Sequence, residues 1–203
     1  MSSQQENVGS MTDFGPLAGL IGVWEGSRGT DISPGFPDRM KTDTEKQYHE
    51  RWVFEPVNPA VTNHDQKLRQ LVCDTSAWRG SPSTAGKIAG EAFHGQRGYW
   101  IWDPASKMVL NSFAVPRGIV INAGGMAEPD ATSFELVAEA GPEVYGICQN
   151  PYLVENFKVV RYLLKLRLGG DGSLDYEQDT QLEIKGRGLL HHTDTNHLVR
   201  QNP

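Results

Sequence analysis

Apolar and polar residues alternate strictly on both sides of a glycine-rich turn in the last third of the chain. Leu164 and Leu166 share a face before the turn, and Leu174 and Tyr176 continue that face after it. Basic residues dominate the opposite face before the turn, and acidic residues dominate it afterwards. A period of two over about ten residues on each side predicts a long β-hairpin across 157–184 with one buried face.

The turn at 169–173 contains three glycines and sets which residues face each other across the hairpin. If these five residues form the loop, Arg167 lies opposite Asp175 and Lys165 lies opposite Glu177. Cross-strand ion pairs contribute roughly 0.2–1 kcal/mol each, so they select the register more than they stabilise the sheet.

Similar short segments, bounded by turns, fill the rest of the chain. Further strands are expected at 22–29, 45–54, 67–78, 88–93, 97–102, 108–115, 118–122 and 132–138. Pro16 favours one short helical turn near the N-terminus, and 139–156 is typical of an extended insertion. The fold class predicted is all-β. About ten strands joined by short turns favour an antiparallel up-and-down β-barrel of the calycin or lipocalin type, which can hold one small-molecule ligand.

Composition then limits the domain organisation and the partners. Residues 1–12 are polar and predict a disordered leader, and 13–203 is long enough for a single barrel domain. The net charge of −6 and the lack of basic runs argue against nucleic acid as a partner. No stretch of about 18 apolar residues predicts a membrane span, and no signal peptide begins the chain, so a cytoplasmic location is expected.

Three of the six histidines, His191, His192 and His197, lie within seven residues of one another. His191 and His192 are adjacent, so only one can face inward on a strand. The parity of Leu182 and Ile184 assigns that position to His192, provided that no bulge intervenes. His197 has two interpretations, because a histidine near a C-terminus is commonly an exposed and inert residue.

Two other sets of residues also keep more than one interpretation. His94 stands between aromatic strand residues, where a core histidine is as reasonable as a ligand. Trp24 and the other four tryptophans can fill a barrel core or line a pocket. Another interpretation of the C-terminal histidines is a non-haem metal cluster, formed by His191, His192 and His197 with Asp194 as a carboxylate ligand.

Three stretches together resemble the nitrobindin family, which comprises haem-binding relatives of the fatty-acid-binding proteins. The segment 22–26, Gly-Val-Trp-Glu-Gly, is similar to the opening Gly-x-Trp-x-Gly signature of that family. The segment 93–100 resembles its pocket strand, in which a histidine precedes Gly-aromatic-aromatic. The segment 196–198 resembles the closing His-Leu motif, which supplies the axial ligand of the haem.

The resemblance implies a ten-stranded barrel that holds haem b near its open end. His197 would be the metal-binding residue, as the axial ligand of the haem iron. His94 and Phe93 would lie on the pocket wall, with Val115 and Trp24 as further haem-binding residues.

The function implied by the resemblance is the interaction of ferric haem with nitric oxide or peroxynitrite, and the family is credited with isomerising peroxynitrite to nitrate. The alternative function is a haem-free, lipocalin-like carrier of an apolar small molecule, favoured by the apolar Val115-Pro116 wall. Association of two barrels into a homodimer is left open.

Overall fold

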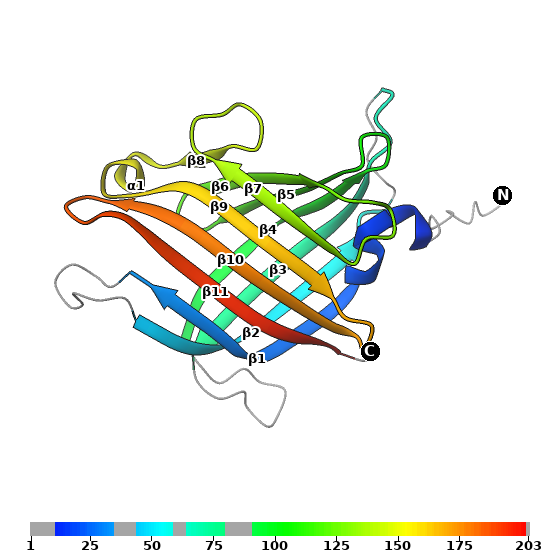
Figure 1. Ribbon diagram of the computed structural model, residues 1–203, viewed down its shortest axis with the longest axis horizontal. Coiled ribbons are helices and arrows are strands. Elements are labelled where there is room, and N and C mark those ends of the chain that lie inside the picture. Colours follow the sequence, from blue (N-terminus) through cyan, green and yellow to red (C-terminus); the bar gives the residue numbers. More distant parts are fainter. Residues whose placement is uncertain (1–10, 35–43, 59–63, 80–90, 202–203) are drawn as a thin grey trace, which may run out of the picture.

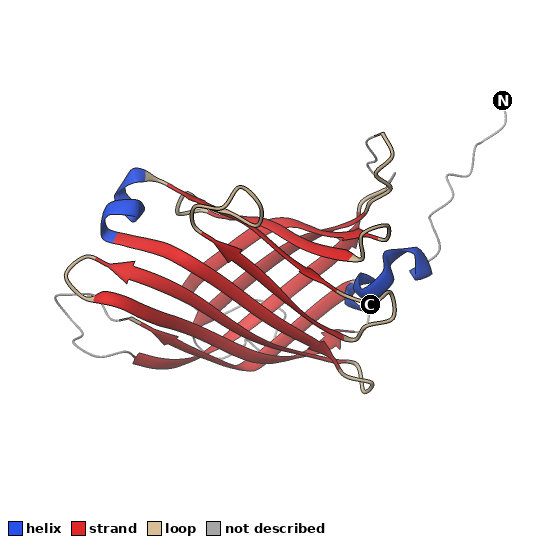
Figure 2. Cartoon of the chain, turned by 45° about the horizontal axis from the view of Figure 1, so that its top comes forward, coloured by secondary structure: helices blue, strands red, loops and turns tan. Residues whose placement is uncertain are grey.

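Eleven antiparallel strands form one sheet, and ten of them close it into a barrel (Figures 1 and 2). The computed structural model describes residues 11–34, 44–58, 64–79 and 91–201. The strands are β1 (Gly22–Ser33), β2 (Thr44–Pro56), β3 (Arg69–Arg79), β4 (Glu91–Asp103), β5 (Met108–Val115), β6 (Ile119–Met126), β7 (Ser133–Glu139), β8 (Ile147–Gln149), β9 (Phe157–Leu168), β10 (Ser173–Ile184) and β11 (Gly188–Gln201).

The strands follow one another around the barrel in chain order, so the predicted up-and-down topology is confirmed. Pairing of β1 with β11 and of β5 with β6 makes the ring continuous. The ring leaves out β8, which pairs with β6 beside the seam between β6 and β7. That seam is held by a single register pair, Gly124 with Val137, whereas β9 and β10 are paired along nearly their whole length.

The hairpin of β9 and β10 has the register predicted from its turn. Arg167 lies opposite Asp175, and Lys165 lies opposite Glu177. The Arg167 Nη2 atom is 3.2 Å from Asp175 Oδ2, and the arginine side chain is largely exposed. The pair therefore selects the register of the hairpin from its solvent face, while the apolar face supplies the burial.

Different elements stand at the two ends of the barrel (Figure 1). The 3-10 segment η1 (Met11–Leu20) covers one end and buries Phe14, Leu17 and Leu20 against the core. The short helix α1 (Pro151–Asn156) lies at the opposite end, where the Asn150 Oδ1 atom caps it by accepting a hydrogen bond from a backbone amide. Below, the end with α1 is called the mouth.

Two segments differ from their predicted structure. The expected strands at 88–93 and 97–102 are one strand, β4, because Gly95 continues the ladder opposite Ser76 instead of breaking it. The expected insertion at 139–156 contains β8 and α1.

The leader expected at 1–12 overlaps the start of η1, and its first ten residues lie outside the described part of the chain. Residues 88–90 of the strand expected at 88–93 also lie outside it. Within the described residues, no helix is long and apolar enough to cross a membrane.

Gly98 on β4 permits a close approach to β5, which offers a test of the barrel wall. A Cβ atom at this position would lie 2.1 Å from the Ser112 backbone oxygen and 2.5 Å from the Phe113 Cα atom. Because both atoms belong to the backbone, Gly98→Ala must separate the two strands. We expect the free energy of unfolding in urea to fall by about 1–3 kcal/mol. Gly170→Ala is the control, because its Cβ meets nothing within 4 Å; an equal loss in both variants would contradict the close-approach argument.

Candidate functional site

The side chains of β11 alternate between the barrel interior and the outer face, and this alternation separates the three C-terminal histidines. Asn196 and Leu198 are buried, and the His197 side chain between them points outward. The His197 Nδ1 atom lies 2.6 Å from Asp175 Oδ1, its register partner on β10. The structure therefore places His197 on the outer face, in a chain of contacts with Asp175 and Arg167.

His191 lies on the same outer face, with its Nδ1 atom 2.8 Å from Asp179 Oδ2. His192 faces the interior, as the parity of the hairpin predicted, because the pairing of β10 with β11 runs without a bulge. The three histidines thus lie on two sides of the sheet, and the structure does not gather them into the metal cluster considered from the sequence.

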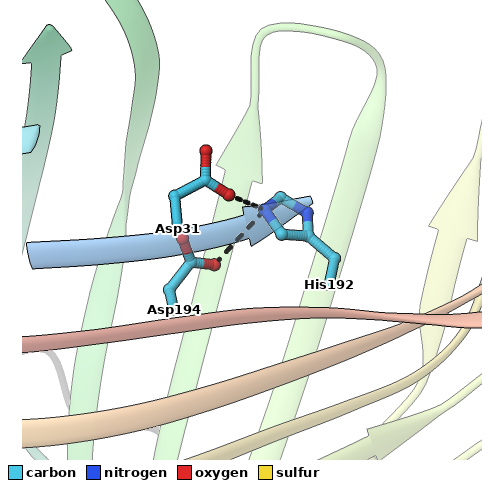
Figure 3. A group of neighbouring side chains, drawn as sticks. All are labelled: Asp31, His192 and Asp194. Carbon is cyan, nitrogen blue, oxygen red and sulfur yellow. Dashed lines mark hydrogen bonds and ion pairs between the residues drawn. The ribbon is translucent and has the colours of Figure 1, made fainter. Parts of the chain in front are cut away.

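Inside the mouth, His192 lies between two aspartates (Figure 3). Its Nε2 atom is 2.8 Å from Asp31 Oδ1 and 3.6 Å from Asp194 Oδ2. Asp31 is the register partner of Asp194 across the β1–β11 pair that closes the barrel. Asp31, His192 and Asp194 are called the mouth cluster below.

Buried charge changes the protonation of the mouth cluster. Burial raises the pKa of Asp194 to about 6, and the negative charge of Asp31 adds to that rise. Burial alone would lower the pKa of His192, but the hydrogen bond with Asp31 and the charge of Asp194 outweigh it and raise the pKa. Near neutral pH the cluster therefore favours the protonated imidazole more than an exposed histidine would.

Three other expected site residues lie at the same end of the barrel. Phe93 and His94 begin β4, and Val115 ends β5. Phe93 packs edge-on against Tyr48, with a ring-centroid distance of 5.7 Å, and the Arg79 guanidinium lies 4.4 Å over its ring. Arg79 also reaches Asp31, at 3.7 Å, so this wall connects to the mouth cluster.

The His94 ring is held by Gln96, whose Oε1 atom lies 3.3 Å from His94 Nε2. Burial lowers the pKa of His94. At pH 7 this imidazole is neutral, so it can donate one hydrogen bond and accept another.

Trp24 lies at the other end of the barrel. Its side chain is 1% exposed, its Nε1 atom donates to the Leu20 carbonyl at 2.7 Å, and the Arg200 guanidinium covers its ring at 4.3 Å. Seven residues of β1 separate Trp24 from Asp31, roughly 20 Å at the rise of a strand. The structure therefore gives Trp24 a core position under η1, away from Phe93, His94 and Val115.

A hydrogen-bond network fills the interior between the two ends, and its members are Tyr48, Glu50, Tyr176 and Asn196. Tyr176 Oη donates to Glu50 Oε2 at 2.7 Å, and Asn196 Nδ2 donates to the same oxygen at 3.1 Å. Tyr48 Oη lies 2.5 Å from Tyr176 Oη and is its donor, because the Tyr176 hydrogen is already committed to Glu50.

Glu50 is the functional candidate that sequence reasoning missed. Burial raises the pKa of Glu50 to about 7, although the hydrogen bonds from Tyr176 and Asn196 oppose the rise. The sequence does carry a signal: Glu50 shares the parity of Tyr48 and Trp52, so period-two alternation already puts this carboxyl group inside. A buried carboxyl group that titrates near neutrality can hold or release a proton inside the barrel.

A groove of about 310 Å³ on the outer face of β2, β3 and β4 is unrelated to this interior. Arg51, Trp78 and Arg97 are among the residues that line it, and none of the expected site residues does. This groove therefore does not contribute to the candidate site.

The raised pKa of Glu50 predicts a dependence of stability on pH. Since the folded state holds this proton from about pH 4.5 to about pH 7 while the unfolded state has lost it, wild-type stability falls as the pH rises through that range. Glu50→Gln keeps an acceptor for Tyr176 and removes the titration. Its stability relative to wild type should rise by about 2–3 kcal/mol between pH 5 and pH 8, measured by urea unfolding.

Glu177→Gln serves as the matched control, because Glu177 is exposed on the outer face of β10. Its stability relative to wild type should stay constant over the same pH range. A flat difference for Glu50→Gln as well would show that the interior carboxyl group titrates like an exposed one.

Known proteins place this barrel in a family. The family model of the THAP4-like, heme-binding beta-barrel domain matches residues 13–200 of this chain. The crystal structure of Rv2717c from M. tuberculosis is similar with a TM-score of 0.63 and 21% identity, over 97% of this chain and 100% of that chain. This likeness concerns the fold alone, and no curated protein matches the sequence. Because the family match spans almost the whole barrel, the chain belongs to the THAP4-like haem-binding β-barrel family, to which its resemblance to the nitrobindins pointed.

Proposed function

We propose that the chain binds haem b at the mouth of the barrel, with His192 as the axial ligand of the iron. The observation that carries this assignment is the direction of the imidazoles on β11: His192 faces the interior, whereas His197 is bonded to Asp175 outside. The resemblance to the nitrobindin family implied His197 instead. The choice between the two is a prediction that one titration can decide.

The residues at the mouth fit a haem. Phe93 and Val115 offer apolar contacts for a macrocycle, and His94 adds a neutral imidazole. The positive charge of Arg117 reaches both His94 and His192: it adds a small part to the lowering of the His94 pKa, which burial dominates, and it slightly opposes the raised pKa of His192. An exposed guanidinium in that place suits the two carboxylates of a haem, which prefer the solvent side of a pocket.

The carboxylates near His192 would tune its binding to iron. A hydrogen bond from one ring nitrogen to a carboxylate fixes the orientation of an imidazole and raises its basicity at the other nitrogen. Asp31 offers this bond from β1, while His192 itself is carried by β11. A haem held here would supply an iron centre able to bind a small diatomic or peroxo ligand.

We infer, from membership of the family and its resemblance to the nitrobindins, that nitric oxide or peroxynitrite is the ligand of the bound haem. The role of the chain would be to restrict water and to offer one neutral hydrogen-bonding group, His94. Isomerisation of peroxynitrite to nitrate is the activity that this arrangement would support. A cytoplasmic location, a monomeric or dimeric barrel, and no binding to nucleic acid are further predictions.

A haem-free carrier of an apolar molecule has less support from the interior. Glu50 lies in the middle of the barrel, and Asp31 and Asp194 lie at its mouth. A fatty acid would bring a carboxylate towards Asp31 and Asp194, which would repel it when they are ionised, and Glu50 makes the middle of the barrel polar. Native mass spectrometry of protein purified from cells tests this alternative, since a bound lipid mass without haem would favour the carrier.

A haemin titration tests the axial ligand. Wild-type protein should develop a sharp Soret band at one equivalent, and His192→Ala should lose this band or weaken binding at least tenfold, which is about 1.4 kcal/mol. His197→Ala is the matched control, because it removes a histidine of the same strand from the outer face, and it should titrate like wild type. The reverse result would assign the iron to His197, and an unchanged band in both variants would remove both.

A further inference from the structure

We propose that Asp31, His192 and Asp194 form a site for one divalent transition-metal ion, of the zinc or cobalt class, in the haem-free protein. Each residue offers one ligand atom, and these atoms all lie within 4.8 Å of one another. The proposal concerns the mouth cluster alone and does not depend on whether haem binds.

The distances in the cluster are close to those that a small ion requires. Zinc lies about 2.0–2.2 Å from nitrogen and carboxylate-oxygen ligands, so two tetrahedral ligand atoms are about 3.4 Å apart. The two separations from His192 Nε2, 2.8 Å and 3.6 Å, lie on either side of that value (Figure 3). The third separation, between the two carboxylate oxygens, is at most 4.8 Å, so small shifts of the two aspartate side chains towards each other would bring the three atoms onto one ion.

The donor set also determines the class of metal. One imidazole nitrogen and two carboxylate oxygens form a mixed set, suited to first-row divalent ions. All-oxygen sets favour magnesium and calcium instead. Three protein ligands leave the remaining coordination positions to water or to a small ligand, as in zinc sites that keep an open position, and the partly exposed side chain of His192 lies on the side from which these would enter.

Contacts behind the ligands hold two of them in place. Gln178 Nε2 donates to Asp194 Oδ2 at 3.2 Å, and Arg79 approaches the second oxygen of Asp31. Asp31 comes from β1, His192 and Asp194 come from β11, and Gln178 comes from β10. The three ligands thus stand on two paired strands, β1 and β11, and Gln178 supports Asp194 from β10. Strands give a more rigid support than loops would.

The charge of the cluster leaves room for a cation. Asp31 is only 2% exposed, and its closest cationic side chain besides His192 is Arg79, at 3.7 Å and itself partly exposed. Two carboxylates share this enclosed space with one histidine. A buried carboxylate is costly unless it is paired or binds a metal, so an ion of charge +2 would stabilise the arrangement.

Two pairs on the outer face provide internal controls for this site. His191 with Asp179 and His197 with Asp175 each combine one imidazole with one carboxylate, at 2.8 Å and 2.6 Å. The described residues contain one group of three potential metal ligands, and it is the mouth cluster. If a single histidine–aspartate pair were enough to bind the metal, the outer pairs would bind it as well as the mouth cluster does. If three ligands are needed, only the mouth cluster among these groups would bind it.

The test is calorimetric titration of haem-free protein with zinc, together with visible absorption of the cobalt complex. Wild-type protein should bind one equivalent of Zn²⁺, and Co²⁺ should give the intense d–d bands of a low-coordinate site. Asp31→Asn, Asp194→Asn and His192→Ala should each weaken zinc binding at least tenfold and reduce the cobalt bands. His197→Ala and His191→Ala, which each alter one outer pair, should bind like wild type.

Circular dichroism and thermal unfolding of each variant identify any that fails to fold. Asp194→Asn is the variant of choice if Asp31→Asn unfolds, because Asp194 is the less buried of the two aspartates. Zinc should also raise the unfolding temperature of the wild type and not that of Asp194→Asn. Absence of a one-equivalent site, or equal binding by the interior variants and the wild type, would overturn the proposal. The titration contains no haem, so its failure leaves the haem proposal intact.

Discussion

The antiparallel pairing of β1 with β11 is the constraint on which the rest of the structure depends. It joins the first and last strands, and in a closed sheet every side chain must point either inward or outward. The same pairing puts Asp31 opposite Asp194, more than 160 positions away in sequence. Closure therefore creates both the shape of the barrel and the chemistry at its mouth, because neither β1 nor β11 carries the mouth cluster alone.

Closure also explains why polar groups can survive inside. The network around Glu50 takes donors from β10 and β11, so its hydrogen bonds form only once the ring is complete. In an open sheet this carboxyl group would be in water, where its ionised form carries little free-energy cost. Inside the barrel burial favours the neutral form of the carboxyl group below about pH 7, and its bond with Tyr176 joins β2 to β10, which are not adjacent in the sheet. The network thereby selects one arrangement of the interior side chains, and the stability of the protein depends on pH.

Sequence reasoning succeeded where one periodicity acts over a long segment. The hairpin alternation gave the register of Arg167 with Asp175 and the inward direction of His192, because both follow from counting along paired strands. Periodicity could not predict which face Asp31 occupies, because this residue follows the irregular stretch of β1 and lies next to a segment of low periodicity. His197 shows the other limit: a motif resemblance identifies residue types, whereas one step along a strand decides which face a side chain occupies.

The binding of a proton, of a small metal ion and of a haem would all involve the same side chains of the mouth cluster. His192 Nε2 already has a partner in Asp31, so any metal that takes this nitrogen must displace a hydrogen bond and leave a buried carboxylate behind. A small divalent ion can bind that carboxylate as well, and so compensates its charge directly. A haem held by the other ring nitrogen of His192 would leave the bond between Nε2 and Asp31 in place. Asp31 therefore has a different role for each occupant: it would bind a small divalent ion directly, and for a haem it would orient the imidazole and raise its basicity.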